Sequence, residues 1–339
     1  MDRRRKVLVM GASGNVGACV TRQLVERGDD VRVLLRRNSS TKGIDGLDVE
    51  RHYGDIFDTG AVAAAMADRD VVFYCVVDTR AHLADPAPLF RTNVEGLRNV
   101  LEVADHADLH RFVFLSTIGT IAVGRNGEAV DEATPFNWAG IGGPYIESRR
   151  KAEELVLSYA AERGFPAVVM NVSNPYGPPD WQPRQGALVA MAAFGKLPVY
   201  IRGVGAEVVG IDDAARALIL AAEHGRIGER YIVSERYMSQ QEMLTVAAEA
   251  VGARPPRIGI PMAAVYAFGS LAGLSNRLFR TEFPINLTAA RLMWWTSPAD
   301  HSKATRELGW KPAPTADAIA RAAQFYVERK NNNEEVISL

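Results

Sequence analysis

The sequence predicts an α/β protein, because short runs of β-branched residues alternate with amphipathic segments through the first half of the chain. The runs with the length and composition of strands are 6–10, 31–35, 49–53, 71–76, 111–115 and 167–171. After the first run Val16, Val20 and Leu24 repeat at helical spacing, and the same spacing recurs over 94–104. Strands connected by helices form a parallel sheet covered on both faces, so we expect a doubly wound sheet of the Rossmann type.

The pattern changes after residue 171, where a loop rich in Pro, Gly and Trp occupies 175–185. Helical patterns follow at 239–250, 263–274 and 314–327, with one short strand pattern near 230–233. We therefore expect a smaller, mostly helical C-terminal substrate lobe. The expected division is a dinucleotide-binding domain of 1–171 plus about 205–235, a substrate lobe of 172–204 and 236–330, and a flexible tail at 331–339.

Composition describes an ordinary globular protein of 339 residues, 47% of them hydrophobic and 23% charged. The 39 basic and 40 acidic residues nearly cancel, so we expect no nucleic-acid partner. The apolar run at 7–10 ends at Gly11, too early for a signal peptide, and the stretch 258–274 is too short to span a bilayer, which leaves peripheral contact with a membrane.

The two cysteines, Cys19 and Cys75, lie in apolar segments with neither CxxC spacing nor a histidine cluster nearby. This pattern indicates reduced core residues and gives no sign of a metal site. We expect a cytoplasmic protein.

A glycine-rich turn follows the first predicted strand directly and opens the first helix. Its residues are Gly11, Ala12, Ser13, Gly14, Asn15, Val16 and Gly17. Glycines at this junction let the backbone approach a pyrophosphate, whose charge then lies at the helix N-terminus. The turn therefore predicts a bound dinucleotide.

The end of the second strand indicates which dinucleotide. Sites that prefer NAD carry an acid there, whereas an arginine favours the 2′-phosphate of NADP. Here Arg36 and Arg37 follow the strand, and we assign Arg36 to the phosphate and Arg37 to solvent. We expect NADP(H), with NAD(H) as the second choice. Asp55 and Ile56 after the third strand would adjoin the adenine, although a simple turn aspartate explains Asp55 nearly as well.

Further motifs recur along nearly the whole chain: NVEG at 93–96, FLST at 114–117, YIESR at 145–149, NPYGP at 174–178, GIDDAA at 210–215 and SKATRELGW at 302–310. In this order they resemble the extended short-chain dehydrogenase/reductase family, also called the NAD-dependent epimerase/dehydratase superfamily. The resemblance is to the branch that holds dihydroflavonol reductases, 3β-hydroxysteroid dehydrogenases and hopanoid-associated epimerase-like proteins. It implies a homodimer formed through the helices near 93–104 and 148–161.

The resemblance also implies a catalytic set. Thr117 would hydrogen-bond the substrate oxygen and Tyr145 would give or take its proton, with a positive charge four residues later to assist a phenol whose ordinary pKa is about 10. The family has a lysine there and this chain has Arg149, which lies beside Tyr145 on a helix, whereas Lys151 faces about 120° away. Arginine keeps its charge and its donors for the ribose hydroxyls but cannot become neutral, so we expect intact cofactor binding and, if anything, slower catalysis.

The same resemblance assigns more residues to the cofactor besides Tyr145 and Arg149. They are Cys75, Val76, Val77, Asn93, Ser116 and Val172. Relatives often have proline at position 172 and alanines at 75–77, so these departures could shift the nicotinamide by a fraction of an ångström.

Hydride transfer between a secondary alcohol and NADP needs only the phenol, the hydroxyl and an oriented nicotinamide. Dehydratases of the family place an Asp-Glu pair after the catalytic threonine, where this chain has Ile118 and Gly119. Candidate pocket residues are apolar, which favours a steroid-, lipid- or flavonoid-like substrate: Tyr176, Trp181, Met262, Tyr266, Phe268, Leu271, Trp294 and Trp295. The alternatives are an NAD(P)-dependent sugar epimerase and a catalytically weak NADPH-binding regulator.

Overall fold

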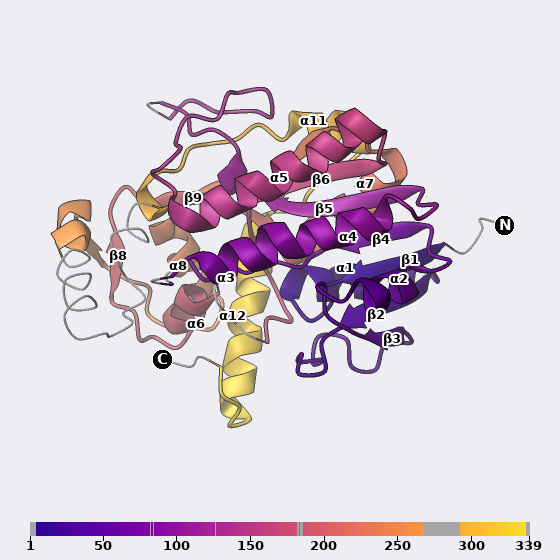
Figure 1. Cartoon of the computed structure of the whole chain (residues 1–339). Coiled ribbons are helices and arrows are strands. Elements are labelled where there is room, and N and C mark those ends of the chain that lie inside the picture. Colours follow the sequence, from indigo (N-terminus) through magenta and orange to yellow (C-terminus); the bar gives the residue numbers. More distant parts are fainter. Residues whose placement is uncertain are drawn as a thin grey trace.

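The computed structural model describes residues 5–336 except 82, 84, 126, 182, 184, 185 and 268–291. Its centre is a seven-stranded parallel sheet in the order β10-β6-β5-β4-β1-β2-β3 (Figure 1). The strands are β1 (Lys6–Met10), β2 (Asp30–Leu35), β3 (Glu50–Tyr53), β4 (Val71–Tyr74), β5 (Arg111–Thr117), β6 (Ala167–Val172) and β10 (Arg230–Val233). All six predicted strands are present, and the short pattern near 230–233 adds a seventh beside β6. The Rossmann-type fold class is confirmed.

Helices cover both faces of this sheet (Figure 1). Residues alternate along β1, with Val7 and Val9 facing α1 (Asn15–Glu26) and α7 (Ile211–His224), and Leu8 and Met10 facing the other side. The helices on that other side are α2 (Thr59–Met66), α4 (Leu97–Ala104) and α5 (Gly143–Arg163). A strand that is buried on both faces has no side chains facing solvent, which explains the continuous apolar runs in the sequence.

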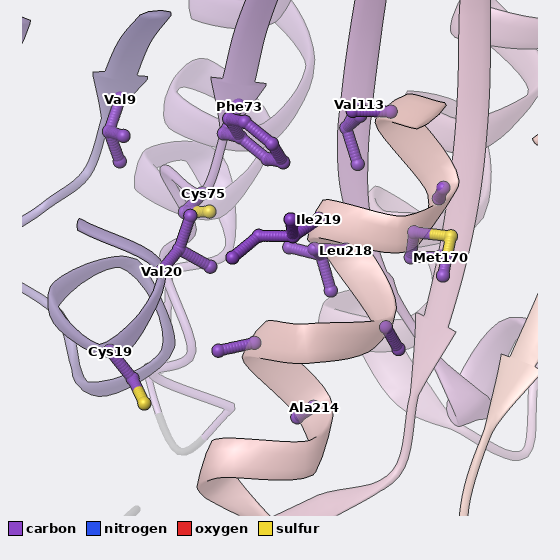
Figure 2. Packing of buried hydrophobic residues seen from close by; sticks show 14 of the residues in the cluster. Val9, Cys19, Val20, Phe73, Cys75, Val113, Met170, Ala214, Leu218 and Ile219 are labelled. Carbon is purple, nitrogen blue, oxygen red and sulfur yellow. The ribbon is translucent and has the colours of Figure 1, made fainter. Parts of the chain in front are cut away.

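Figure 2 shows the core on the α1 and α7 side, where strand residues meet these two helices. Val9, Phe73, Val113 and Met170 come from four strands and lie in one cluster with Leu218 and Ile219 of α7. This packed layer lies below the carboxyl edge of the sheet, where the loops after all the parallel strands meet.

The connection from β4 to β5 contains α3 (Ala87–Phe90) and a π-helical turn η1 (Arg91–Gly96), which leads into α4. After β5 the chain forms a short 3-10 turn η2 (Ile118–Thr120) and runs through an irregular excursion to α5. The helix α5 begins with Pro144 in its first turn and ends at Gly164, whose φ of 66° is left-handed.

A second core lies beside the sheet and joins α6 (Ala187–Ala193), α8 (Gln240–Glu249) and α12 (Thr315–Asn331). The lobe also has two small sheets, one in the order β11-β9-β7 and one that pairs β12 with β8. Their strands are β7 (Asn174–Tyr176), β8 (Val199–Ile201), β9 (Gly205–Gly210), β11 (Arg236–Ser239) and β12 (Ile258–Ile260). Sequence patterns missed these strands because most have only three or four residues. The helix α11 (Ser302–Leu308) returns to pack on β10 and α7.

The exact division into two domains stays a prediction. Of the helix expected at 263–274, residues 262–267 are helical and the remainder lies outside the described residues, as do Phe268 and Leu271. In the expected flexible tail, residues 331–335 are exposed and Val336 is 8% exposed in the second core, while Arg329 on α12 pairs with Glu334 at 3.0 Å. Within the described ranges, no helix is both long enough and apolar enough to cross a bilayer.

Candidate functional site

The glycine-rich turn after β1 is shaped by backbone contacts that exclude side chains. Gly11 has a φ of 88°, and a Cβ added to it would lie 2.6 Å from the carbonyl carbon of Cys75. A Cβ on Gly17 would lie 2.3 Å from the Gly11 carbonyl oxygen. Gly14 donates its N–H to that same oxygen at 3.0 Å and begins α1 without a side-chain cap. The first turn of α1 thus offers N–H groups to an anion, as a dinucleotide pyrophosphate requires.

Asn15, next to Gly14, forms a hydrogen bond with a residue from a distant part of the chain. Its side-chain amide donates to Asp180 Oδ1 at 2.5 Å, and Tyr326 of α12 donates its hydroxyl to Asp180 Oδ2 at 2.6 Å. Asp180 is 5% exposed. This link from the turn to the second core has no local sequence signal, because Asn15 and Asp180 are 165 positions apart. Within the same turn Ala12 is buried, Ser13 is exposed and Val16 is half-buried.

The ends of β2 and β3 carry the residues predicted for the adenosine part. The exposed Arg36 forms no side-chain hydrogen bond or ion pair with the described residues, and Arg37 lies over the Tyr53 ring at 5.9 Å. Asp55 Oδ1 accepts the Phe57 N–H at 3.1 Å. This hydrogen bond is the one expected if Asp55 stabilises a turn, the alternative to an adenine contact. Ile56 is buried in the α4 and α5 core, where a Cβ on Gly96 would meet it at 2.3 Å.

After β4, Cys75 points into the core on the α1 and α7 side (Figure 2), while Val76 and Val77 are half-buried. The Asn93 amide is fully engaged within the protein. It donates to the Asp78 carbonyl and to Ser148 Oγ, both at 3.0 Å, and accepts the Asp78 N–H at 2.8 Å. In this arrangement Asn93 fixes the loop after β4 against α5 and has no donor left for a cofactor.

Tyr145 and Thr117 meet where α5 begins and β5 ends. Thr117 lies close enough to Tyr145 to lower the pKa of the phenol, but burial acts more strongly and raises that pKa overall. The positive charge of Arg149 also acts to lower it. Thr117 Oγ1 accepts the Gly119 N–H at 3.2 Å. A phenol with a raised pKa is protonated at neutral pH and can donate.

Arg149 lies one turn beyond Tyr145 and is 1% exposed. Its Nη2 donates to the Leu115 carbonyl at 2.5 Å, and its guanidinium lies 5.0 Å from the Phe114 ring centre. Burial lowers its pKa. The Nε and Nη1 groups find no hydrogen-bond partner among the described residues, and neither does the buried Tyr74 hydroxyl. Buried donors without partners cost free energy, so the Arg149 guanidinium and the Tyr74 hydroxyl are destabilising as they lie here.

The remaining residues predicted for the site lie in different surroundings from one another. Lys151 lies over the Phe90 ring at 5.1 Å, away from Tyr145. Ser116 donates its hydroxyl to the buried Glu153 at 2.5 Å, a carboxylate that the sequence analysis did not assign. Val172 is buried at the end of β6, and the next hydroxyl, on Ser173, is buried without a described partner.

The predicted pocket residues belong to several clusters. Tyr176 lies in the second core, Trp181 packs on Phe325, and Met262 and Tyr266 form a small cluster with Val204. Trp294 and Trp295 are 46% and 40% exposed. A pocket of about 780 Å³ lies at the opposite, amino edge of the sheet between Lys6 and His106 and contains no predicted site residue. The described residues contain no group of three or more His, Cys, Asp or Glu side chains arranged to hold a metal.

Known proteins match this chain over most of its length. The family described as "NAD dependent epimerase/dehydratase family" matches residues 7–234. "Sterol demethylase protein B" of Methylococcus capsulatus is 30% identical over 95% of this chain and 98% of its own. A "putative dihydroflavonol 4-reductase" of Synechocystis is 28% identical over 94% and 93%. A crystal structure titled gox2253 superposes with a TM-score of 0.85 at 30% identity, covering 97% of this chain and 99% of that one.

Proposed function

Because the chain belongs to the NAD-dependent epimerase/dehydratase family, whose members act with a nicotinamide cofactor, we propose that it is an NADP(H)-dependent oxidoreductase. In this proposal it interconverts a secondary alcohol and a ketone on an apolar substrate of steroid-, lipid- or flavonoid-like kind. The closeness of Tyr145 to Thr117 and Arg149, both of which act on its pKa, carries the proposal, because it places a proton donor near a second hydroxyl that can bind the same substrate oxygen.

The proposed cofactor site has two parts. The α1 N-terminus at Gly14 binds the pyrophosphate. Arg149 binds the ribose hydroxyls after its guanidinium, which is buried in this structure, turns its Nε and Nη1 donors toward them. The cofactor, when bound, supplies or accepts the hydride. The exposed Arg36 at the end of β2 pairs with a 2′-phosphate, which supports NADP(H) over NAD(H) because that strand ends without an acid.

In ketone reduction, Tyr145 gives its proton to the substrate oxygen while Thr117 donates a hydrogen bond to the same atom. Arg149 lowers the cost of the phenolate that results, because a fixed positive charge beside it stabilises the anion. The guanidinium itself cannot pass on a proton, so Tyr145 recovers one from water or through a ribose hydroxyl.

The substrate class is supported by the relatives named for sterol and dihydroflavonol chemistry and by the apolar side chains of the lobe. A sugar epimerase remains the alternative that the family itself suggests. A weakly catalytic NADPH-binding regulator is favoured by one observation, the arginine buried where the family resemblance expects a lysine. We also propose a cytoplasmic homodimer formed through α4 and α5.

The test is turnover of a panel of ketosteroids and flavonoid-like ketones with NADPH and with NADH. Wild type should reduce at least one ketone faster with NADPH. Tyr145→Phe should lose turnover by about 100-fold or more while retaining cofactor affinity. Tight NADPH binding without turnover across the panel would contradict the enzyme and support the regulator.

A further inference from the structure

A buried carboxylate lies behind the proposed catalytic residues. Glu153 on α5 is 3% exposed. Its Oε2 accepts hydrogen bonds from Ser116 Oγ at 2.5 Å and from Thr120 Oγ1 and Asn171 Nδ2, both at 2.7 Å. Its Oε1 forms an ion pair with Arg230 Nη1 at 3.0 Å. One side chain thus joins α5 to β5, to the η2 turn, to β6 and to β10.

This arrangement needs an ionised acid. A carboxylate accepts on both oxygens and donates nothing, so it can receive four donors together. A glutamine of the same shape would turn an N–H group toward one set of those donors. A buried charge is tolerated when it is paired and hydrogen-bonded, and Arg230 supplies the opposite charge.

The network reaches the backbone of the catalytic threonine. Thr120 Oγ1 lies 2.7 Å from the Thr117 carbonyl oxygen, and Asn171 Nδ2 lies 3.4 Å from it. Asn171 Nδ2 also donates to Glu153, and the single proton of the Thr120 hydroxyl goes either to Glu153 or to the Thr117 carbonyl. Ser116, the residue before Thr117, is bound to Glu153 directly. The carboxylate therefore fixes the end of β5 on both sides of Thr117.

The same carboxylate fixes the helix that carries the phenol. Tyr145, Arg149 and Glu153 are spaced by four residues, so they lie along one face of α5. An anchor at Glu153 sets the rotation and the height of that face over β5. Arg230 extends the network to the excursion between Thr117 and Tyr145, because its Nη2 donates to the Glu132 carbonyl.

We propose that Glu153 is a positioning residue that holds the Tyr145 hydroxyl against Thr117. The inference rests on the proposed function, since it concerns the same two catalytic groups. A displacement of reacting groups by about 1 Å can lower a rate by about 100-fold, so a loosened anchor reduces turnover without touching substrate or cofactor.

The test compares Glu153→Gln with Glu154→Gln, which makes the same change one residue along the helix at an exposed side chain paired with Arg150. Glu153→Gln should lower kcat by about 10- to 100-fold, with KM for NADPH close to wild type. Glu154→Gln should leave both unchanged. Asn171→Asp added to Glu153→Gln exchanges acceptor and donor between the two positions, so kcat should recover in part. A fall in kcat that only follows the loss of folded protein, or an unchanged kcat, would overturn the proposal.

Hydrogen exchange of the amides at 116–121, measured without cofactor or substrate, separates this inference from the proposed function. Exchange should be faster in Glu153→Gln than in Glu154→Gln, even if wild type reduces no ketone of the panel. Equal exchange in the two variants would overturn the anchor whatever the activity. If Glu153→Gln does not fold, Thr120→Val decides: faster exchange and a lower kcat support the anchor, and wild-type values of both refute it.

Discussion

The glycine-rich turn and the inner face of α5 make opposite demands on the sequence. The turn functions through backbone groups, and Gly11 and Gly17 leave no room for a Cβ. The α5 face functions through side chains, where Arg149 and Glu153 are buried against β5 and find their partners on other elements. The turn therefore depends on the absence of side-chain atoms, which the local sequence reveals, whereas the α5 face depends on long-range contacts, which the local sequence does not reveal.

The largest expected effect tests the turn. Gly17→Ala places a Cβ 2.3 Å from the Gly11 carbonyl oxygen, so the turn must open at a cost of about 1–3 kcal/mol. We expect calorimetry to detect no dinucleotide binding and urea unfolding to show reduced stability. Gly28→Ala is the control outside the turn: its φ of 83°, unlike that of Gly17, is left-handed and strains an alanine, but nothing lies within 4 Å of the added carbon, so binding should be kept. If both variants bind NADP(H) like wild type, the backbone account of the turn is wrong.

The next effect separates catalysis from stability on α5. Arg149→Met removes a buried charge that has one described hydrogen bond, so the free energy of unfolding should stay equal or rise by about 1 kcal/mol. The kcat should fall by about 100-fold, because the phenolate loses its cation. Arg150→Met, at the neighbouring half-buried position that pairs with Glu154, is the control. A strongly destabilised Arg149→Met would show instead that the guanidinium is structural.

A conservative substitution of the same residue tests whether the site is adapted to arginine. Arg149→Lys keeps the charge and restores a group that can titrate. A higher kcat than wild type would show that arginine impairs this site, and a lower one would show that the site is adapted to it. Because Arg149 already binds the Leu115 carbonyl and lies over Phe114, we expect a modest loss in steady-state assays.

The pH dependence should follow the Tyr145 phenol. Burial raises its pKa above the ordinary value of about 10, so the proton that reduction requires is present throughout the neutral range. Ketone reduction should therefore be flat from about pH 6 to 9 and fall only above about pH 10, while alcohol oxidation rises with pH. A loss of reductive kcat near pH 7 would contradict Tyr145 as the donor.

The smallest effect concerns the link between the two cores. Tyr326→Phe removes the hydrogen bond to Asp180, which should lower the free energy of unfolding by about 1 kcal/mol in urea. Tyr53→Phe, at a ring that is 49% exposed, should change nothing measurable. Equal stability of the two variants would show that this link does not contribute.

Much of the sheet could be predicted because buried parallel strands leave a local pattern of β-branched residues. The pairing of β10 with β6 and the strands β7, β8 and β12 could not, because three or four residues carry no periodicity. The family register indicates which positions adjoin a site but not where each side chain points. The assignment of Asn93 and Ser116 to the cofactor stays a prediction, and sequence did not indicate that their side chains bind Asp78, Ser148 and Glu153.

Contacts between residues far apart in the sequence could not be predicted either. Asp180 is hydrogen-bonded to Asn15, 165 positions away, and to Tyr326, 146 positions away, and no sequence motif predicts either contact. The Glu153 network has the same character, since its partners lie on four other elements. Polar side chains reveal such roles only when the fold brings them together.

The central claim is that the turn after β1 binds a nicotinamide dinucleotide at the start of α1. Calorimetric titration of the wild-type chain with NADP⁺ and with NAD⁺ tests it directly. We expect saturable binding of each dinucleotide at one site, with a higher affinity for NADP⁺. Absence of binding heat with both dinucleotides, at temperatures chosen to exclude a zero enthalpy, would contradict it.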